Sequence, residues 1–208
     1  MARSLELPDG RNVDLDYFVE WRPYLWRRPL EHALKFMGDL RGKRILEIGG
    51  RSGRMTSLFA MQGAQVTMVE VGDLAAAQAE VAKWGVTDQV RFIQTAGGFD
   101  EIAGETFNVI FTKSVLWCIE PLGEFLDAID SHLAEGGRVA FLENWRGGRV
   151  LFWVRRNLIH RSRFDWESHY VGIHPDQIPL FEERFADLHV RRHRFLVYEI
   201  FGRKRRAG

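Results

Sequence analysis

The stretch Arg44-Ile-Leu-Glu-Ile-Gly-Gly-Arg-Ser-Gly53 carries most of the information about how this chain folds. Its first half is a short apolar run of strand length, and glycines end that run abruptly. Glycine allows the backbone to pass close to a ligand, and a helix after such a turn points its free N–H groups into the same space. We therefore expect a buried strand, a ligand-binding turn and a helix, in that order.

The rest of the chain repeats this alternation of strands and helices. Short apolar runs predict strands at residues 44–48, 66–69, 90–94, 107–112 and 138–142. Apolar residues at helical spacing predict helices at residues 55–61, 74–84 and 122–133, the last one stopped by the glycines at 136–137, and another helix with Pro29 in its first turn. Residues 188–202 look like strand-forming sequence, as an antiparallel pair. This order predicts an α/β fold with a parallel sheet covered on both faces.

Composition indicates a globular protein with a single domain. Of the 208 residues, 46% are hydrophobic and 27% are charged. No stretch approaches the roughly 20 apolar residues that span a bilayer, and the N-terminus lacks the pattern of a signal peptide. The lone cysteine, Cys118, cannot form an internal disulfide. A reducing compartment suits such a chain, so we expect a cytoplasmic protein.

The turn after residue 48 favours a nucleoside cofactor that is not a dinucleotide. Glu70 ends the second predicted strand, and a carboxylate at that place can accept hydrogen bonds from both hydroxyls of a ribose. The dinucleotide fingerprint G-x-G-x-x-G fails from Gly49, because Arg51 and Arg54 stand where glycines are needed. A Walker phosphate loop is also absent, since no Gly-Lys-Ser/Thr follows the glycines.

Four stretches resemble the class I S-adenosylmethionine-dependent methyltransferases. Residues 45–53 are similar to motif I of that family, and Glu70 matches the acidic residue after its second strand. Residues 107–116 resemble its fourth strand, and residues 133–142 its approach to the fifth. The resemblance implies a Rossmann-like, doubly wound and mostly parallel seven-stranded sheet, with an antiparallel last strand and helices on both faces. It also implies S-adenosylmethionine as the cofactor and S-adenosylhomocysteine as the product.

By this resemblance, the cofactor site lies at the carboxyl ends of the first four strands. The residues implied to bind the cofactor are Glu47, Gly49, Gly50, Gly53, Glu70, Val71, Thr95, Ala96, Lys113 and Ser114, with Met68, Val71, Ala96 or Phe99 beside the adenine. Lys113 fits a solvated loop lysine equally well. The sequence departs from the family at Arg51, which replaces the middle glycine of motif I, and at Thr95, where the family often has an acid.

A hydroxyl acceptor would need a base with a pKa near neutrality, for which histidine is the natural choice. His169 and His174 fall where this family commonly builds its acceptor pocket, and Glu143 after the fifth strand is a third candidate. The residues expected to contact the substrate are Tyr17, Trp21, Tyr24, Trp117 and Tyr170. For the N-terminal aromatics, packing on the core is an equally good interpretation. No cluster has convincing metal spacing, so we predict no metal.

A basic segment narrows the choice of partner. Residues 146–163 hold six arginines and no acidic residue. As a helix, residues 149–163 would have an apolar and a basic side, which fits an anionic acceptor, a peripheral contact with a membrane, or nucleic acid phosphates. We favour the first, because 208 residues leave no room for a separate RNA-binding domain. We expect no stable nucleic acid partner, and the oligomeric state stays open.

The sequence thus predicts methyl transfer to a small molecule, with a hydroxyl of a sugar or secondary metabolite, anionic or carrier-linked, as the favoured acceptor. The alternatives are an RNA or protein methyltransferase and a non-catalytic methyltransferase-like binding protein. The parts of the single domain are predicted as an N-terminal helical lid (1–42), a cofactor-binding core (43–143), an acceptor-side insertion (144–187), terminal strands (188–203) and a basic tail (204–208).

Overall fold

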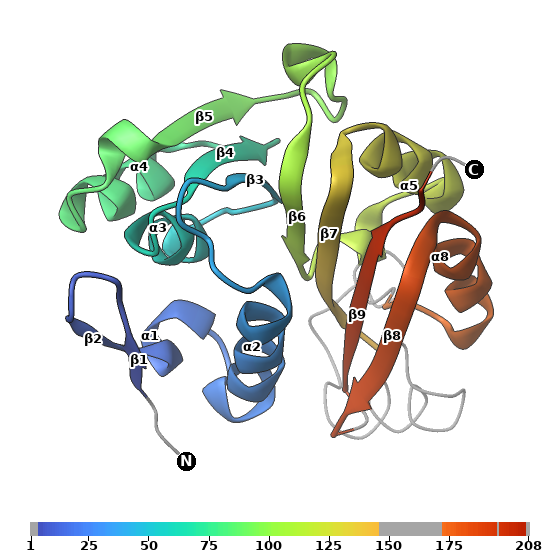
Figure 1. Ribbon diagram of the computed structural model, residues 1–208, viewed down its shortest axis with the longest axis horizontal. Helices are drawn as coiled ribbons and strands as arrows, with labels where there is room; N and C mark the ends of the chain where they lie inside the picture. Colours follow the sequence, from blue (N-terminus) through green and yellow to red (C-terminus); the bar gives the residue numbers. More distant parts are fainter. Residues whose placement is uncertain (1–3, 146–171, 195, 207–208) are drawn as a thin grey trace, which may run out of the picture.

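A computed structural model describes residues 4–145, 172–194 and 196–206 of the chain (Figure 1). Its central sheet has seven strands in the order β5-β4-β3-β6-β7-β9-β8. The strands are β3 (Arg44–Ile48), β4 (Gln65–Glu70), β5 (Val90–Gln94), β6 (Phe107–Lys113), β7 (Leu133–Asn144), β8 (Phe185–His193) and β9 (Val197–Lys204). Strands β3 to β7 are parallel, and β9 runs antiparallel to both β7 and β8. The predicted Rossmann-like sheet with an antiparallel last strand is therefore confirmed.

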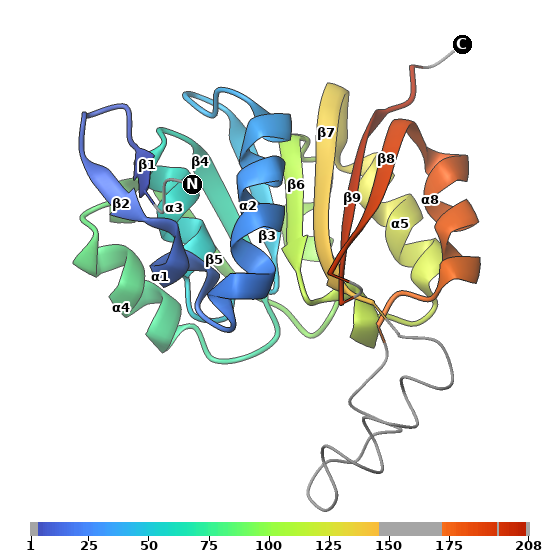
Figure 2. The same ribbon diagram turned by 90° about the horizontal axis from the view of Figure 1, so that it is seen from below.

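Helices cover both faces of this sheet. They are α1 (Leu15–Val19), α2 (Pro23–Met37), α3 (Arg54–Met61), α4 (Ala75–Lys83), α5 (Leu122–Ser131) and α8 (Ile178–Arg184), with short 3-10 turns η1 (Thr87–Gln89), η2 (Asp100–Ile102), η3 (Leu116–Cys118) and η5 (Pro175–Gln177). One core layer holds apolar side chains of α1 to α4, and the other holds those of α5 and α8. Figure 2 shows α2 beside the middle strands and α8 at the β8 end. Within the described ranges, no helix has the length and apolar character needed to cross a membrane.

The N-terminal segment begins with a small antiparallel sheet, β1 (Ser4–Glu6) and β2 (Asn12–Asp14), which the sequence pattern did not predict. The prediction that Pro29 lies in the first turn of its helix is wrong, because α2 begins at Pro23. Proline suits the first turn, where its missing N–H costs no hydrogen bond. Pro29 lies inside α2 and is buried with Trp26 and Leu30, so this helix forms part of the core.

Two predicted boundaries are also wrong. The helix α5 ends at Ser131, and Leu133 opens β7 opposite Phe107 instead of closing the helix. The glycines at 136–137 lie within β7 beside a shift of register. Because Leu133 fits a helical stripe and a buried strand equally well, the pattern could not separate the two. The terminal pair of strands starts at Phe185, three residues before the predicted start at 188.

Candidate cofactor site

The turn after β3 brings the backbone close to two neighbouring elements. Gly49 has φ 75, and a Cβ on it would lie 2.4 Å from Val115 Cγ2. Gly53 has φ 74, and a Cβ on it would lie 2.8 Å from the backbone of Ala77 in α4. Both positions need glycine, since any other residue would be strained and would collide. Because these residues have no side chain, the segment after β6 can pack against Gly49 and α4 can pack against Gly53.

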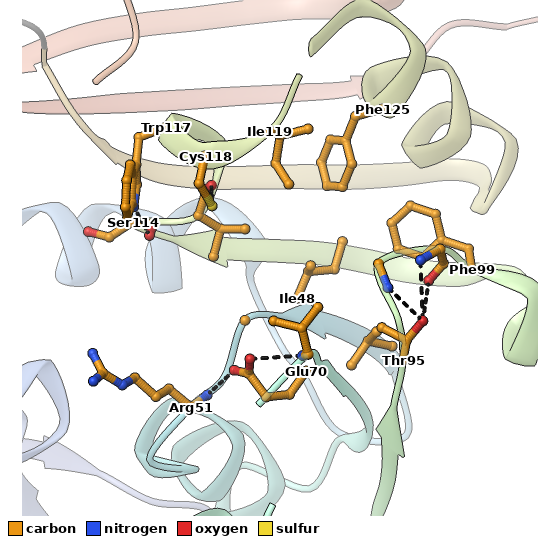
Figure 3. Close-up of a pocket in the computed structure, with 16 residues that line it drawn as sticks. Ile48, Arg51, Glu70, Thr95, Phe99, Ser114, Trp117, Cys118, Ile119 and Phe125 are labelled. Carbon is orange, nitrogen blue, oxygen red and sulfur yellow. Dashed lines mark hydrogen bonds between the residues drawn. The ribbon is translucent and has the colours of Figure 1, made fainter. Parts of the chain in front are cut away.

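Glu70 joins the end of β4 to this glycine turn. One carboxylate oxygen accepts a hydrogen bond from the backbone N–H of Arg51 at 2.9 Å. The other accepts from the N–H groups of Val71 at 2.9 Å and Gly72 at 3.0 Å. Arg51 has φ 40, so it adopts the left-handed conformation that glycine usually supplies. Figure 3 shows its side chain extended away from Thr95 and Phe99.

A pocket of about 270 Å³ opens at the carboxyl ends of the parallel strands (Figure 3). Its lining residues come from the ends of β3 and β4, the turn after β5, the chain after β6 and the start of α5: Ile48, Gly49, Arg51, Val69, Glu70, Val71, Thr95, Gly97, Gly98, Phe99, Ser114, Val115, Trp117, Cys118, Ile119 and Phe125. Most of this lining is apolar, with the Glu70 carboxylate on one side. Open α/β sheets bind their ligands at this end of the strands.

Half of the residues predicted to bind the cofactor line this pocket. They are Gly49, Glu70, Val71, Thr95 and Ser114. The others, placed outside the lining, are Glu47, Gly50, Gly53, Ala96 and Lys113. Trp117, predicted to contact the substrate, lines the pocket as well. The motif therefore points to this pocket, but it does not distinguish residues that line the pocket from residues that hold the turn.

Glu47 and Lys113 do not line the pocket. Glu47 is buried and accepts a hydrogen bond from Thr56 Oγ1 at 2.5 Å, so it braces α3 against β3. Burial raises the pKa of Glu47 to about 7. Lys113 places its Nζ 5.2 Å from the centre of the Trp26 ring, on the α2 side of the sheet. Burial lowers the pKa of Lys113, while the carboxylates of Glu20, Glu47 and Glu143 oppose that shift.

Residues 114–119, which we call the pocket wall, follow β6 and contain η3. Ser114 has φ 58, its hydroxyl accepts a hydrogen bond from Asn144 Nδ2 at 3.1 Å, and its carbonyl accepts one from Trp117 Nε1 at 2.7 Å. Val115, Cys118 and Ile119 of this wall line the pocket and were not predicted as site residues. An apolar run directly after a parallel strand was the available signal, because ligands bind where such strands end.

Glu143 lies near the end of β7 and has no exposed surface. Its carboxylate accepts hydrogen bonds from Thr112 Oγ1 at 2.8 Å, from the N–H of Val115 at 3.1 and 3.0 Å, and from the N–H of Leu116 at 3.1 Å. Burial raises the pKa of Glu143 to about 7, although these hydrogen bonds oppose the shift. Glu143, which was predicted as a base, thus binds backbone N–H groups of the pocket wall.

Comparison with known proteins assigns the chain to a family. Residues 18–171 match a family described as a methyltransferase domain. The chain belongs to this methyltransferase family. The ubiquinone biosynthesis O-methyltransferase of Pseudomonas syringae pv. tomato (strain ATCC BAA-871 / DC3000) is 30% identical over 105 residues, which are 50% of this chain and 45% of that protein. The chain therefore spans about half the length of the curated relatives it matches.

Solved structures show the same fold at low sequence identity. The N-methyltransferase NodS from Bradyrhizobium japonicum WM9, solved with S-adenosyl-L-homocysteine, has a TM-score of 0.65 and 17% identity, over 93% of this chain and 94% of that chain. An O-methyltransferase family protein from Burkholderia thailandensis has a TM-score of 0.69 and 12% identity, over 93% of this chain and 60% of that chain. The class I fold predicted from the resemblance is confirmed.

Three of the predicted substrate contacts do not line the described pocket. Tyr17 donates a hydrogen bond to Glu80 Oε1 at 2.6 Å and packs against Trp84, so it faces α4. Trp21 and Tyr24, before and within the first turn of α2, are 52% and 59% exposed. For Tyr17, the alternative interpretation as a packing residue describes the observed contacts.

His174, one of the two predicted histidine bases, does not line the described pocket. His174 caps η5, and its Nδ1 contacts the carboxylate of Asp176. His169, Tyr170 and the basic segment 149–163 lie outside the described residues. The roles of these residues stay predictions.

Proposed function

We propose that the protein is an S-adenosylmethionine-dependent methyltransferase that acts on a small-molecule acceptor. The observation that carries the proposal is the Glu70 carboxylate, which borders the pocket beside the glycine turn. Three backbone N–H groups fix its orientation. A carboxylate has about four acceptor sites, so capacity remains for a ribose hydroxyl.

The remaining lining suits the other parts of a nucleoside cofactor. Val71, Phe99, Ile119 and Phe125 offer apolar contacts for an adenine ring. Gly49 carries no side chain that would separate the ligand from the backbone. S-adenosylmethionine, when bound, supplies a methyl group that its sulfonium already activates.

The role of the protein is then to align an acceptor with that methyl group and to exclude water. Alignment alone can contribute on the order of 7–11 kcal/mol in favourable cases. For a hydroxyl acceptor, His169 or His174 would take the proton. We propose an oxygen acceptor on a sugar or secondary metabolite, anionic or carrier-linked, and the curated relatives named as O-methyltransferases support oxygen.

The same proposal gives different roles to two parts of the chain. Residues 43–143 would hold the cofactor, and residues 144–187, with their arginines, would face the acceptor. Guanidinium groups pair well with phosphate or carboxylate, which is the reason to begin with anionic acceptors.

Calorimetric titration with S-adenosylmethionine and S-adenosylhomocysteine tests the proposal. We expect saturable binding at one site in the wild type and about 100-fold weaker binding in Glu70→Ala, because hydrogen bonds to a charged group contribute about 1.5–3 kcal/mol each. Glu183→Ala, which removes an exposed carboxylate on α8, is the matched control and should bind like the wild type. Absence of binding by either ligand would reject the enzyme and leave a methyltransferase-like binding protein.

A further inference from the structure

We propose that Glu143 is a positioning residue, which fixes the pocket wall in place instead of removing a proton from the acceptor. The inference rests on the proposed function, because this wall lines the pocket assigned to S-adenosylmethionine. It corrects the expected role of Glu143 as a base.

The contacts of the carboxylate support this role. Its oxygens accept from the N–H groups of Val115 and Leu116, at 3.0–3.1 Å, where η3 begins. The first N–H groups of a helical turn have no partner within that turn, so an acceptor from elsewhere must satisfy them. Thr112 Oγ1, at 2.8 Å, fixes the rotation of the carboxylate. Glu143 thus caps η3 from a strand that is distant in sequence.

The capped residues touch the rest of the site directly. Val115 Cγ2 lies 2.4 Å from the place where a Cβ of Gly49 would stand, so the wall packs on the glycine turn without a gap. Next to Glu143, Asn144 donates to the hydroxyl of Ser114. Ser114 precedes Val115 in the chain, and Trp117 donates a hydrogen bond to the carbonyl of Ser114. Movement of Val115 would therefore displace Ser114 and Trp117, which line the pocket.

Burial argues against a direct role in proton transfer. Glu143 has no exposed surface, and both of its oxygens already accept hydrogen bonds from the chain. An acceptor hydroxyl could reach this carboxylate only after the wall had moved away. A general base must lie within hydrogen-bond reach of the proton that it takes.

Glu143→Gln and a matched control separate positioning from general stability. Glu199→Gln is the control, since Glu199 is equally buried on the neighbouring strand β9 and contacts His32 Nδ1 at 2.8 Å, not the wall. Hydrogen exchange should show the amides of Val115 and Leu116 exchanging at least tenfold faster in Glu143→Gln and at the wild-type rate in Glu199→Gln. Calorimetry should show at least tenfold weaker binding of S-adenosylhomocysteine in Glu143→Gln alone.

Equal exchange at Val115 and Leu116 in both variants would overturn the inference. If the wild type binds no S-adenosylhomocysteine, the proposed function fails, and the exchange comparison still decides the role of Glu143. If Glu143→Gln does not fold, Thr112→Val replaces it, because it removes one contact of the same carboxyl group and keeps that group. Faster exchange at Val115 and Leu116 in Thr112→Val supports the inference, and unchanged exchange overturns it.

Discussion

On the β3–β4 side of the pocket, the contacts that shape the site join residues close in sequence, whereas on the β6–β7 side they join distant ones. Glu47 and Thr56 are 9 residues apart, and Arg51 and Glu70 are 19 apart. Glu143 reaches Val115 across 28 residues and Thr112 across 31. The first side is therefore nearly complete once a strand, a turn and a helix have formed. The second side exists only after β7 has paired with β6.

The two sides also differ in the hydrogen-bond donors that they supply to a buried carboxyl group. Burial raises the pKa of Glu47 and of Glu143 to about 7. Glu47 accepts a hydrogen bond from the hydroxyl of Thr56, while Glu143 accepts from two backbone N–H groups and a hydroxyl. The two carboxyl groups thus have similar pKa values but different structural roles. Glu47 holds α3 against β3, and Glu143 holds the pocket wall.

The largest loss of stability is expected at Gly49, where the two sides of the pocket are in contact. Gly49→Ala would place a Cβ 2.4 Å from Val115 Cγ2 on a residue with φ 75. Backbone strain of about 1–2 kcal/mol and overpacking of about 1–3 kcal/mol should lower the free energy of unfolding by about 2–5 kcal/mol. Urea denaturation measures the loss, and S-adenosylhomocysteine binding should fall at least 100-fold.

Gly104→Ala supplies the matched control for this change. Gly104 also has φ 75, but no atom lies within 4 Å of its Cβ position. Its cost should be the strain alone, about 1–2 kcal/mol. Equal losses in the two variants would mean that the contact between glycine turn and wall contributes nothing.

The next largest effect of a single residue is its contribution to the pH dependence of stability. Because the folded-state pKa values of Glu47 and Glu143 lie near 7 and the ordinary value is 4.5, the native state holds protons that the unfolded chain releases between pH 4.5 and 7. The free energy of unfolding should therefore fall as pH rises through this window and level off above pH 7. Each carboxyl contributes at most about 3 kcal/mol to the fall.

Urea denaturation of Glu47→Gln and Glu143→Gln across this pH range separates the two sides of the pocket. Each variant should lose its own part of the slope. A slope that survives in Glu47→Gln but vanishes in Glu143→Gln would place the titration on the wall side alone. Unchanged slopes in both variants would exclude these two groups as its source.

Two isosteric threonine variants compare the partners of these carboxyls. Thr56→Val removes the hydroxyl that donates to Glu47, and Thr112→Val leaves Glu143 with the N–H groups of Val115 and Leu116. We expect losses of about 2 kcal/mol for Thr56→Val and about 1 kcal/mol for Thr112→Val, because a group left without a partner costs more than a shared one. Thermal unfolding measures both, and the reverse order would contradict the comparison.

The smallest effects concern two residues with left-handed backbone, one on each side. Arg51→Gly relieves φ 40 and keeps the N–H that binds Glu70, so it should raise stability by up to about 1 kcal/mol. Ser114→Gly relieves φ 58 but loses the hydroxyl that accepts from Asn144, so its net change should be near zero. Thermal unfolding of the two variants gives the difference, and destabilisation by Arg51→Gly would show that its side chain has a structural role.

The sequence alone determined the order of strands and helices between residues 44 and 142, the glycine turn and the position of Glu70. These features depend on periodicity and on backbone conformations that few residues adopt, and both are properties of short stretches. The same reasoning put Gly53 and Glu47 among the expected ligand contacts, although neither lines the described pocket, because a motif marks a turn without saying which way each of its residues points. It also could not tell whether Leu133 ended a helix or began a strand.

Only the tertiary structure decided what Glu143, Val115 and Tyr17 contact. Glu143 reaches Val115 through the register of two neighbouring strands, and Tyr17 meets Glu80 through the packing of α1 near α4. Such contacts depend on which elements lie side by side and on the direction of each side chain, which no local pattern specifies. For this reason the glycine turn was predictable from the sequence, and the contacts that Glu143 makes with the pocket wall were not.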